Sequence, residues 1–219
     1  MIMARGTTFG GWHSHRDFHL IQQKVEVQPA PPKLNLVAIP GADGSKDLST
    51  QPAGRVVYGD RKITWTFALY PGENWDNKHR EVSNALNGQA FDIALDTDPD
   101  YFYHGRLSVS KYKVDGLLRQ ITVEATCRPY KLKRITTKVE ATMTSTFQTL
   151  ALVNERKLVI PTVTITAEAT LRWQGRTVTL TAGTHRIADI ELQAGVNLLE
   201  VRATGGSGKI TVTYQEGAL

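Results

Sequence analysis

Cysteine is the scarcest residue in this chain of 219 amino acids, with Cys127 as its single representative. One thiol excludes an intrachain disulfide, and it argues strongly against a cysteine-ligated zinc site. Cys127 occupies a strand position in the segment T-V-E-A-T-C. We therefore expect it to act as a small buried hydrophobic residue.

Long apolar runs are missing as well. None approaches the roughly 20 consecutive apolar residues that a transmembrane helix needs. The N-terminal segment Met1–Gly6 lacks the apolar centre of a signal peptide. These absences predict a protein made inside the cell, with no membrane insertion.

The net charge is small, because 26 Lys and Arg stand against 21 Asp and Glu and give +5. This net charge is spread thinly along the chain. The densest basic run, residues 128–134, is interpreted as a solvated linker, because nucleic-acid readers usually show a broader basic stripe with stacking aromatics. The glycine-rich stretches 41–46 and 205–209 do not have the spacing of a phosphate-binding P-loop. No cofactor is therefore expected.

A catalytic constellation is also missing. Asp96, Asp98 and Asp100 have the spacing of a calcium loop, but Tyr101 stands where that loop needs Gly and Leu107 where it needs Glu. We interpret the segment as a turn between two strands, because Asp and Pro build turns. A glycosidase pair stays open, since sequence spacing does not set the separation of two carboxylates. The prediction is that the chain is not an enzyme.

Three histidines near the N-terminus, His13, His15 and His19, raise a metal hypothesis. Period-2 spacing would put the first two on one face of a strand, but no further ligands can be placed beside them. Histidines without such partners mostly form ordinary hydrogen bonds. No metal site is expected.

The first half of the chain predicts a mainly β unit with one surface helix. Residues 63–69 alternate apolar and polar side chains, which is typical of a half-buried strand. Residues 75–86 have a single apolar face, with Asn74 as a plausible N-cap. Residues 91–95 and 101–109 form a hairpin across the acidic turn, and residues 117–126 pair back onto it.

The second half predicts a β-sandwich of jelly-roll character. A polar, Thr-rich stretch, Ile135–Thr149, is interpreted as the boundary, so the expected domains are residues 1–140 and 141–219. Short strands separated by glycine turns indicate the sandwich. They are expected at residues 158–167, 169–173, 177–181, 184–192, 197–203 and 209–215.

Several segments, in this order and spacing, resemble siphophage distal tail proteins, the hub subunits of the baseplate. In the second half the resemblance rests on the Leu192–Asn197 turn and the Gly208–Tyr214 strand. In the first half it rests on H-S-H-R-D-F, P-K-L-N-L-V-A-I-P-G-A-D-G-S-K-D-L, V-Y-G-D-R-K-I-T-W-T-F, W-D-N-K-H-R-E-V-S-N-A-L-N-G, D-T-D-P-D-Y-F-Y-H-G-R-L and C-R-P-Y-K.

The resemblance implies a belt domain that forms a homohexameric ring, with a galectin-like sandwich outside it. It implies a place at the virion tail tip, after assembly in the host cytoplasm. The implied partners are the tail tube protein, a tail-tip (tail-associated) protein and the tape measure protein, while DNA passes through the lumen without specific binding. A tail tube-like ring protein and a carbohydrate-binding sandwich, with Trp173 stacking on a sugar, remain alternatives.

Residues 34–39 and the turn that follows are the candidate arm that reaches a neighbouring protomer, since unpaired strand edges invite another chain. A plain intramolecular hairpin is the alternative. The candidate inter-subunit contacts are Leu34, Leu36, Ile39, Pro40, Gly41, Asp43 and Gly44.

Overall fold

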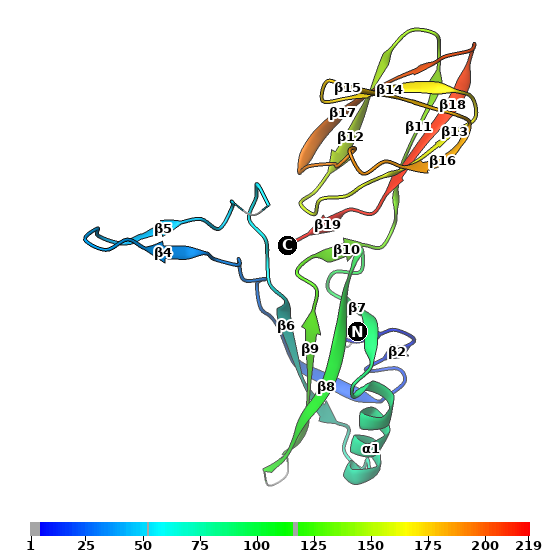
Figure 1. The fold of residues 1–219 in the computed structure, drawn as a ribbon. Helices are drawn as coiled ribbons and strands as arrows, with labels where there is room; N and C mark the ends of the chain where they lie inside the picture. Colours follow the sequence, from blue (N-terminus) through cyan, green and yellow to red (C-terminus); the bar gives the residue numbers. More distant parts are fainter. Residues whose placement is uncertain (1–4, 52, 116–117) are drawn as a thin grey trace. The chain divides into compact units, whose positions relative to one another are not determined.

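The computed structural model describes residues 5–51, 53–115 and 118–219 (Figure 1). The start of the segment examined for a signal peptide, residues 1–4, and the first residue of the strand expected at 117–126 lie outside the described residues. The chain divides into two compact units, the first ending at Lys131 and the second running from Leu132 to Leu219. The sequence places this division after residue 140 instead. In the described part of the chain no helix is long and apolar enough to cross a membrane.

The first unit is built on an antiparallel sheet whose strands follow the order β2-β1-β7-β8-β9-β6-β3. The buried residues of β6 alternate with partly exposed ones, which confirms the strand predicted over residues 63–69. The bounds of the strands are β1 Thr7–Phe9, β2 Trp12–His13, β3 Leu20–Val27, β6 Arg61–Leu69, β7 Ala90–Leu95, β8 Tyr101–Asp115 and β9 Leu118–Cys127.

This sheet folds over an aromatic core. Phe9 of β1 and Trp65 of β6 are four strand spacings apart along the sheet, a separation of about 19 Å if the sheet were flat. Their ring centroids are only 5.1 Å apart, in an edge-to-face arrangement. Strands near the two ends of the sheet therefore face each other, and the core between them gives the unit its sandwich-like character.

The helix α1, Trp75–Leu86, has the bounds and the buried face that the sequence predicts. Asn74 is its N-cap, and the side-chain oxygen of Asn74 accepts a hydrogen bond of 3.0 Å from the backbone N–H of Asn77. Trp75, Val82 and Leu86 are the buried residues of the helix. They join the same core as Trp65, so the helix covers the sheet through one apolar face.

The second unit is a sandwich of two four-stranded sheets, ordered β11-β18-β13-β16 and β12-β17-β14-β15. Of the eight sandwich strands, taken in chain order, one sheet holds the first, third, sixth and eighth and the other sheet holds the second, fourth, fifth and seventh, the alternation of a jelly roll. The predicted jelly-roll sandwich is thus confirmed. The bounds are β11 Thr137–Met143, β12 Gln148–Asn154, β13 Thr162–Ile165, β14 Ala169–Trp173, β15 Arg176–Leu180, β16 Gly183–Arg186, β17 Gly195–Ala203 and β18 Gly208–Tyr214.

The Thr-rich stretch 135–149 contains strand structure that the sequence analysis did not predict. Strand β11 lies within it and pairs with β18 along its whole length. Val139, Ala141 and Met143 are turned toward the core, while the polar residues between them are more exposed. Two further short strands, β10 (Lys131–Lys133) and β19 (Gly217–Ala218), and the hairpin strands β4 (Leu36–Ala38) and β5 (Ser45–Asp47) complete the described elements.

Candidate functional site

The candidate arm is a hairpin that continues the ladder between β3 and β6. Beyond that ladder the backbone N–H of Gly59 donates to the carbonyl of Pro31 at 2.7 Å, and the N–H of Lys33 donates to the carbonyl of Val57 at 2.7 Å. The hairpin then closes with β4 paired to β5. Figure 1 shows these two strands as a hairpin separate from the other strands of the first unit. We call residues 34–48 the arm.

The arm exposes large aliphatic side chains. Leu34 is 61% exposed, Leu36 54%, Val37 43% and Ile39 47%. Leu36 and Val37 are consecutive strand residues, so their side chains point to opposite faces of the hairpin. An isolated two-stranded hairpin is marginally stable in water. Both faces of the arm therefore present apolar surface that a partner could cover.

The root of the arm is held by Ser49, which is buried. Its hydroxyl accepts a hydrogen bond of 2.8 Å from the N–H of Asn35, and its own N–H donates to Oδ1 of Asp47 at 2.8 Å. The side-chain and backbone hydrogen bonds from Ser49 lower the pKa of Asp47. These bonds close the base of the hairpin by joining its two strands through Ser49.

The tip of the arm is a tight turn built by Pro40 and Gly41. The N–H of Ala42 donates to the carbonyl of Ile39 at 3.1 Å, and Gly41 has a φ of 80°. Pro followed by a residue with positive φ is the signature of a type II turn. A side chain at Gly41 would be strained by this backbone conformation.

All seven residues predicted as inter-subunit contacts lie on this arm, and all are exposed (Leu34, Leu36, Ile39, Pro40, Gly41, Asp43 and Gly44). Val37 is also exposed on the arm but is not among the predicted contacts, although its place between Leu36 and Ile39 in an apolar run was visible. The sequence analysis also missed Ser49, whose role depends on a bond to a residue fourteen positions earlier.

The acidic turn after β7 anchors two separate segments. Asp96 accepts a hydrogen bond of 2.8 Å from the N–H of Gly6 and lies 3.2 Å from Nε2 of His13. Asp98 forms an ion pair of 2.7 Å with Lys131, at the start of β10. The two carboxylates thus bind different parts of the chain, as expected of a turn whose role is structural.

The three histidines near the N-terminus diverge to different partners. His13 pairs with Asp96, His15 lies 2.8 Å from the hydroxyl of Tyr70, and His19 lies 3.5 Å from Glu73. Across residues 5–51, 53–115 and 118–219, no three His, Cys, Asp or Glu side chains are grouped so that they could hold a metal ion.

Cys127 is buried at the end of β9. Burial raises the pKa of its thiol to about 12, despite the opposing effect of the nearby Arg61. A thiolate is the reactive form of cysteine, so Cys127 serves packing. Gly105 lies directly opposite it on β8.

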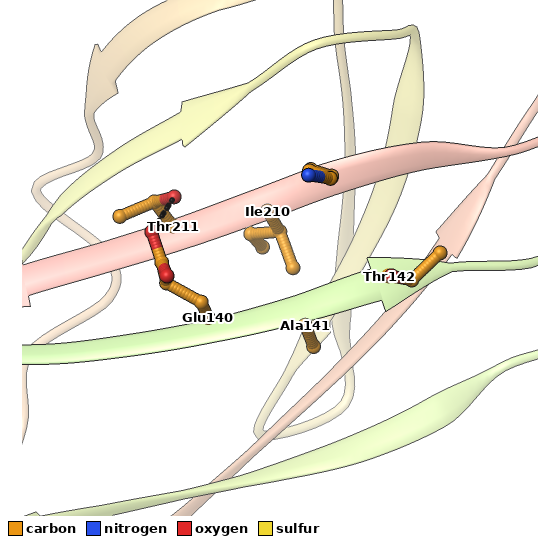
Figure 2. A pocket seen from close by; sticks show the side chains of 6 residues that line it. Glu140, Ala141, Thr142, Ile210 and Thr211 are labelled. Atoms are coloured by element: carbon orange, nitrogen blue, oxygen red, sulfur yellow. Dashed lines mark hydrogen bonds between the residues drawn. The ribbon is translucent and has the colours of Figure 1, made fainter.

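The outer face of β11 and β18 carries a shallow polar hollow (Figure 2). Figure 2 shows Glu140 and Thr211 joined across the two strands, with the Thr211 hydroxyl donating to Glu140 at 3.3 Å. Lys138 also pairs with Glu140 at 2.7 Å, and its hydrogen bond is the main cause of the lowered pKa of that carboxyl. The Thr211–Glu140 contact is a cross-strand pair, whereas Lys138 and Glu140 are two residues apart on the same strand. Both contacts are typical of a solvated sheet face.

Trp173, the residue expected to stack on a sugar if the sandwich is a carbohydrate-binding module, is only 5% exposed. It belongs to the core of the second unit, beside Leu171 and Val201. The open aromatic platform that such a module would use is therefore not formed by this ring.

Comparison with solved structures reveals a protein of the same architecture. Over 98% of this chain and 99% of the other, the structure is similar to the Dit protein (gp 19.1) of phage SPP1, with a TM-score of 0.67 and 15% sequence identity. The chain has the fold of a distal tail protein. The resemblance noted in the sequence is thereby confirmed for the fold, including the order of the two units.

A de novo designed double-stranded β-helix is also similar, over 37% of this chain and 99% of that one, at a TM-score of 0.27 and 13% identity. A score this low carries no argument about the distal tail protein fold. No protein-family model and no curated protein sequence matches the chain.

Proposed function

We propose that the chain is the hub subunit at the distal end of a long, non-contractile phage tail. The observation that carries this proposal is the match of both units, in order, to SPP1 Dit. That protein is described as a paradigm of the hub adsorption apparatus in phages that infect Gram-positive bacteria. No catalytic step is part of the proposed role.

In this proposal six copies form a closed ring through their first units. A cyclic ring above two members is built from head-to-tail contacts, in which one surface of a subunit meets a different surface of the next. The arm supplies the first surface. Its strands β4 and β5 form a two-stranded sheet, so among the described residues each has one edge without a strand partner.

Docking of the arm on the neighbouring protomer would cover Leu34, Leu36, Val37 and Ile39. Each is about half exposed, so its burial contributes on the order of 1 kcal/mol. The unpaired backbone groups of the arm can add main-chain hydrogen bonds by strand addition. Four such side chains on each of six arms make the arm a sizeable part of the ring contact.

The ring would join the tail tube protein on one side to a tail-associated tip protein on the other, with the tape measure protein reaching its lumen. DNA would pass through without specific binding. The virion tail tip, reached by assembly in the host cytoplasm, is the proposed location.

Immunogold labelling of intact tails tests this place directly. Antibodies raised against the purified chain should label the tip of each tail and no other part. Labelling along the full length of the tube would favour the tail tube-like ring protein instead, and absence of label from tails that contain the antigen by mass spectrometry would require an internal location.

A further inference from the structure

The two sheets of the sandwich have four edge strands, and three of them are protected against the addition of another chain. β11 carries Lys138 and Glu140, which form an exposed ion pair. β15 begins with Arg176, which pairs with Asp189 at 3.2 Å. β16 is only four residues long and ends with Arg186. Charged side chains and short length are means by which natural edge strands avoid pairing with a foreign chain.

The fourth edge strand, β12, has neither kind of protection. Its seven residues, Gln148–Asn154, include no charged residue and no proline. Thr149, Ala151 and Val153 are exposed and alternate with buried residues, so they lie on the outer face of the sheet. An uncharged edge strand of this length is a template for pairing with another chain. β12 is therefore the edge of the sandwich that is open to a partner.

Strand β17 extends the apolar surface of β12. In the ladder between the two strands, Ala151 lies opposite Leu198 and Val153 lies opposite Val196. Residues directly opposite in a ladder share a face of the sheet, so these four side chains form one aliphatic block on the outer face. Val153 is 56% exposed, Val196 67% and Leu198 60%. Exposed aliphatic side chains that are contiguous, rather than scattered singly, mark interaction sites.

The same face becomes cationic toward the far end of β17. Arg202 follows Leu198 by four residues, a distance of about 13 Å along the strand. Just before β12, the ring centroid of Phe147 lies 4.1 Å from the guanidinium of Arg172 and 4.7 Å from that of Arg202. Arg172 is paired with Glu200 at 3.1 Å, whereas no carboxylate of the described residues pairs with Arg202.

We propose that β12 and the aliphatic block receive an extended segment of a partner protein by strand addition. Main-chain hydrogen bonds to β12 would hold the segment, and its alternate side chains would give specificity. Aliphatic side chains of the segment cover the block, and a carboxylate beside Phe147 neutralises Arg202. The hydroxyl of Tyr214 already donates to the carbonyl of Val153 at 2.7 Å, so the segment pairs with backbone groups nearer the start of β12.

Charge decides against a second copy of this chain as the occupant. A parallel second β12 would put two copies of Arg202 side by side. An antiparallel one would bring Arg156, which follows β12, toward Arg202, and Oε2 of the adjacent Glu155 is buried. Neither arrangement neutralises Arg202, and like charges that face each other destabilise a sheet contact. The occupant is therefore a protein of different sequence.

Fluorescence anisotropy with labelled peptides and the full chain tests this surface. The first peptide alternates valine and threonine and has an aspartate at each end, so that one carboxylate reaches Arg202 in either direction of addition. The second has lysine at both ends, and the third is the aspartate peptide with N-methyl groups on alternate residues. Val153→Lys charges the edge, and Arg202→Gln removes the cation. Ile135→Lys is the matched control, at an aliphatic residue of the second unit that is 76% exposed and lies outside β12 and β17.

We expect the wild-type chain to bind the aspartate peptide about tenfold or more tightly than the lysine peptide, the effect of one hydrogen bond to a charged group. Arg202→Gln should remove this preference. Val153→Lys should abolish binding, whereas Ile135→Lys should leave it unchanged, and urea midpoints of both variants check their folding. The N-methylated peptide should not bind, because strand addition depends on main-chain N–H groups.

The proposal is wrong if the aspartate peptide does not bind, if N-methylation leaves its affinity unchanged, if Val153→Lys binds like Ile135→Lys, or if Arg202→Gln keeps the preference for aspartate. Association of wild-type sandwiches that Val153→Lys abolishes, with no peptide bound, would assign β12 to a second copy and would also overturn it. The surface lies outside the arm, so native mass spectrometry of Val153→Lys should still show the assembly of the wild type. A failure of strand addition therefore leaves the hub role untouched, and a failure of ring closure leaves the peptide measurement valid.

Discussion

Replacing Gly105 by Ala should destabilise the first unit, because β8 and β9 approach too closely at this position for a side chain. A methyl group on Gly105 would lie 2.5 Å from Sγ of Cys127, 2.7 Å from the carbonyl oxygen of Thr126 and 2.9 Å from Cα of Cys127. Two of these three atoms are backbone, so the strands themselves must separate.

The size of the effect follows from two opposing contributions. Overpacking a filled core costs about 1–3 kcal/mol. Replacing Gly by Ala also restricts the unfolded chain, which returns about 0.4–1 kcal/mol. The expected net loss in free energy of unfolding is therefore about 1–2 kcal/mol, and the urea midpoint should fall by roughly 0.5–1 M.

Urea denaturation followed by tryptophan fluorescence measures this loss, in a Trp173→Phe background so that the signal reports on the first unit. Gly11→Ala is the control, since a methyl group there would meet nothing within 4 Å. Cys127→Ala removes the Sγ contact and should recover part of the stability of the Gly105→Ala chain. A Gly105→Ala midpoint equal to that of the control would refute the proposed close approach.

Three further predictions concern the helix cap and two ionisable groups. Asn74→Ala should lower the stability of the first unit by about 1 kcal/mol, because the cap bond to Asn77 is lost. Urea midpoints of the variant and the wild type measure this loss, and equal midpoints would mean that the cap contributes nothing. Burial raises the pKa of the Cys127 thiol from 9.0 to about 12. The contribution of this thiol to the free energy of unfolding is therefore fully present below pH 9 and is lost as pH rises toward 12. Thiol labelling at neutral pH should accordingly require unfolding, and rapid labelling of the folded chain would contradict this. Hydrogen bonding, chiefly from Arg16, lowers the pKa of Asp17 from 3.8 to about 2. The contribution of the ionised Asp17 carboxylate to the stability of the folded chain should persist above pH 4 and disappear as pH falls toward 2. A carboxyl titration by NMR with a midpoint near 4 would exclude that shift.

The parts of the fold that the sequence predicts are those with strong local patterns. Helix α1 has an apolar face and an N-cap within one short segment, and β6 alternates over its whole length. The turn at Pro40 and Gly41 likewise depends only on adjacent residues.

The parts that the sequence analysis missed depend on distant partners. Strands β1 and β2 are three and two residues long, and β1 is defined by its pairing with β7 more than eighty positions later. Strand β11 was hidden by its Thr-rich composition, although Thr favours strands and Val139, Ala141 and Met143 alternate correctly. Composition alone predicted a domain boundary at this segment, whereas pairing with β18 makes it a strand.

The candidate site divides in the same manner. Residues 34–39 and the turn that follows were predicted to be an arm because unpaired strand edges invite another chain, but the exposure of aliphatic side chains on both faces required the structure. The ion pair between Arg176 and Asp189 was not predicted, since it joins the start of β15 to the segment that follows β16.

Native mass spectrometry over a range of concentrations tests the central claim, that the arm closes a ring, most directly. The wild-type chain should appear at six times the mass of the protomer. Leu36→Asp combined with Val37→Asp places a charge on each face of the arm and should leave monomers, whereas Ile135→Asp, at a side chain 76% exposed outside the arm, should still form the six-membered species. A wild-type monomer at every concentration, also with the tail tube protein added, or a hexamer that survives both arm substitutions, would contradict the account.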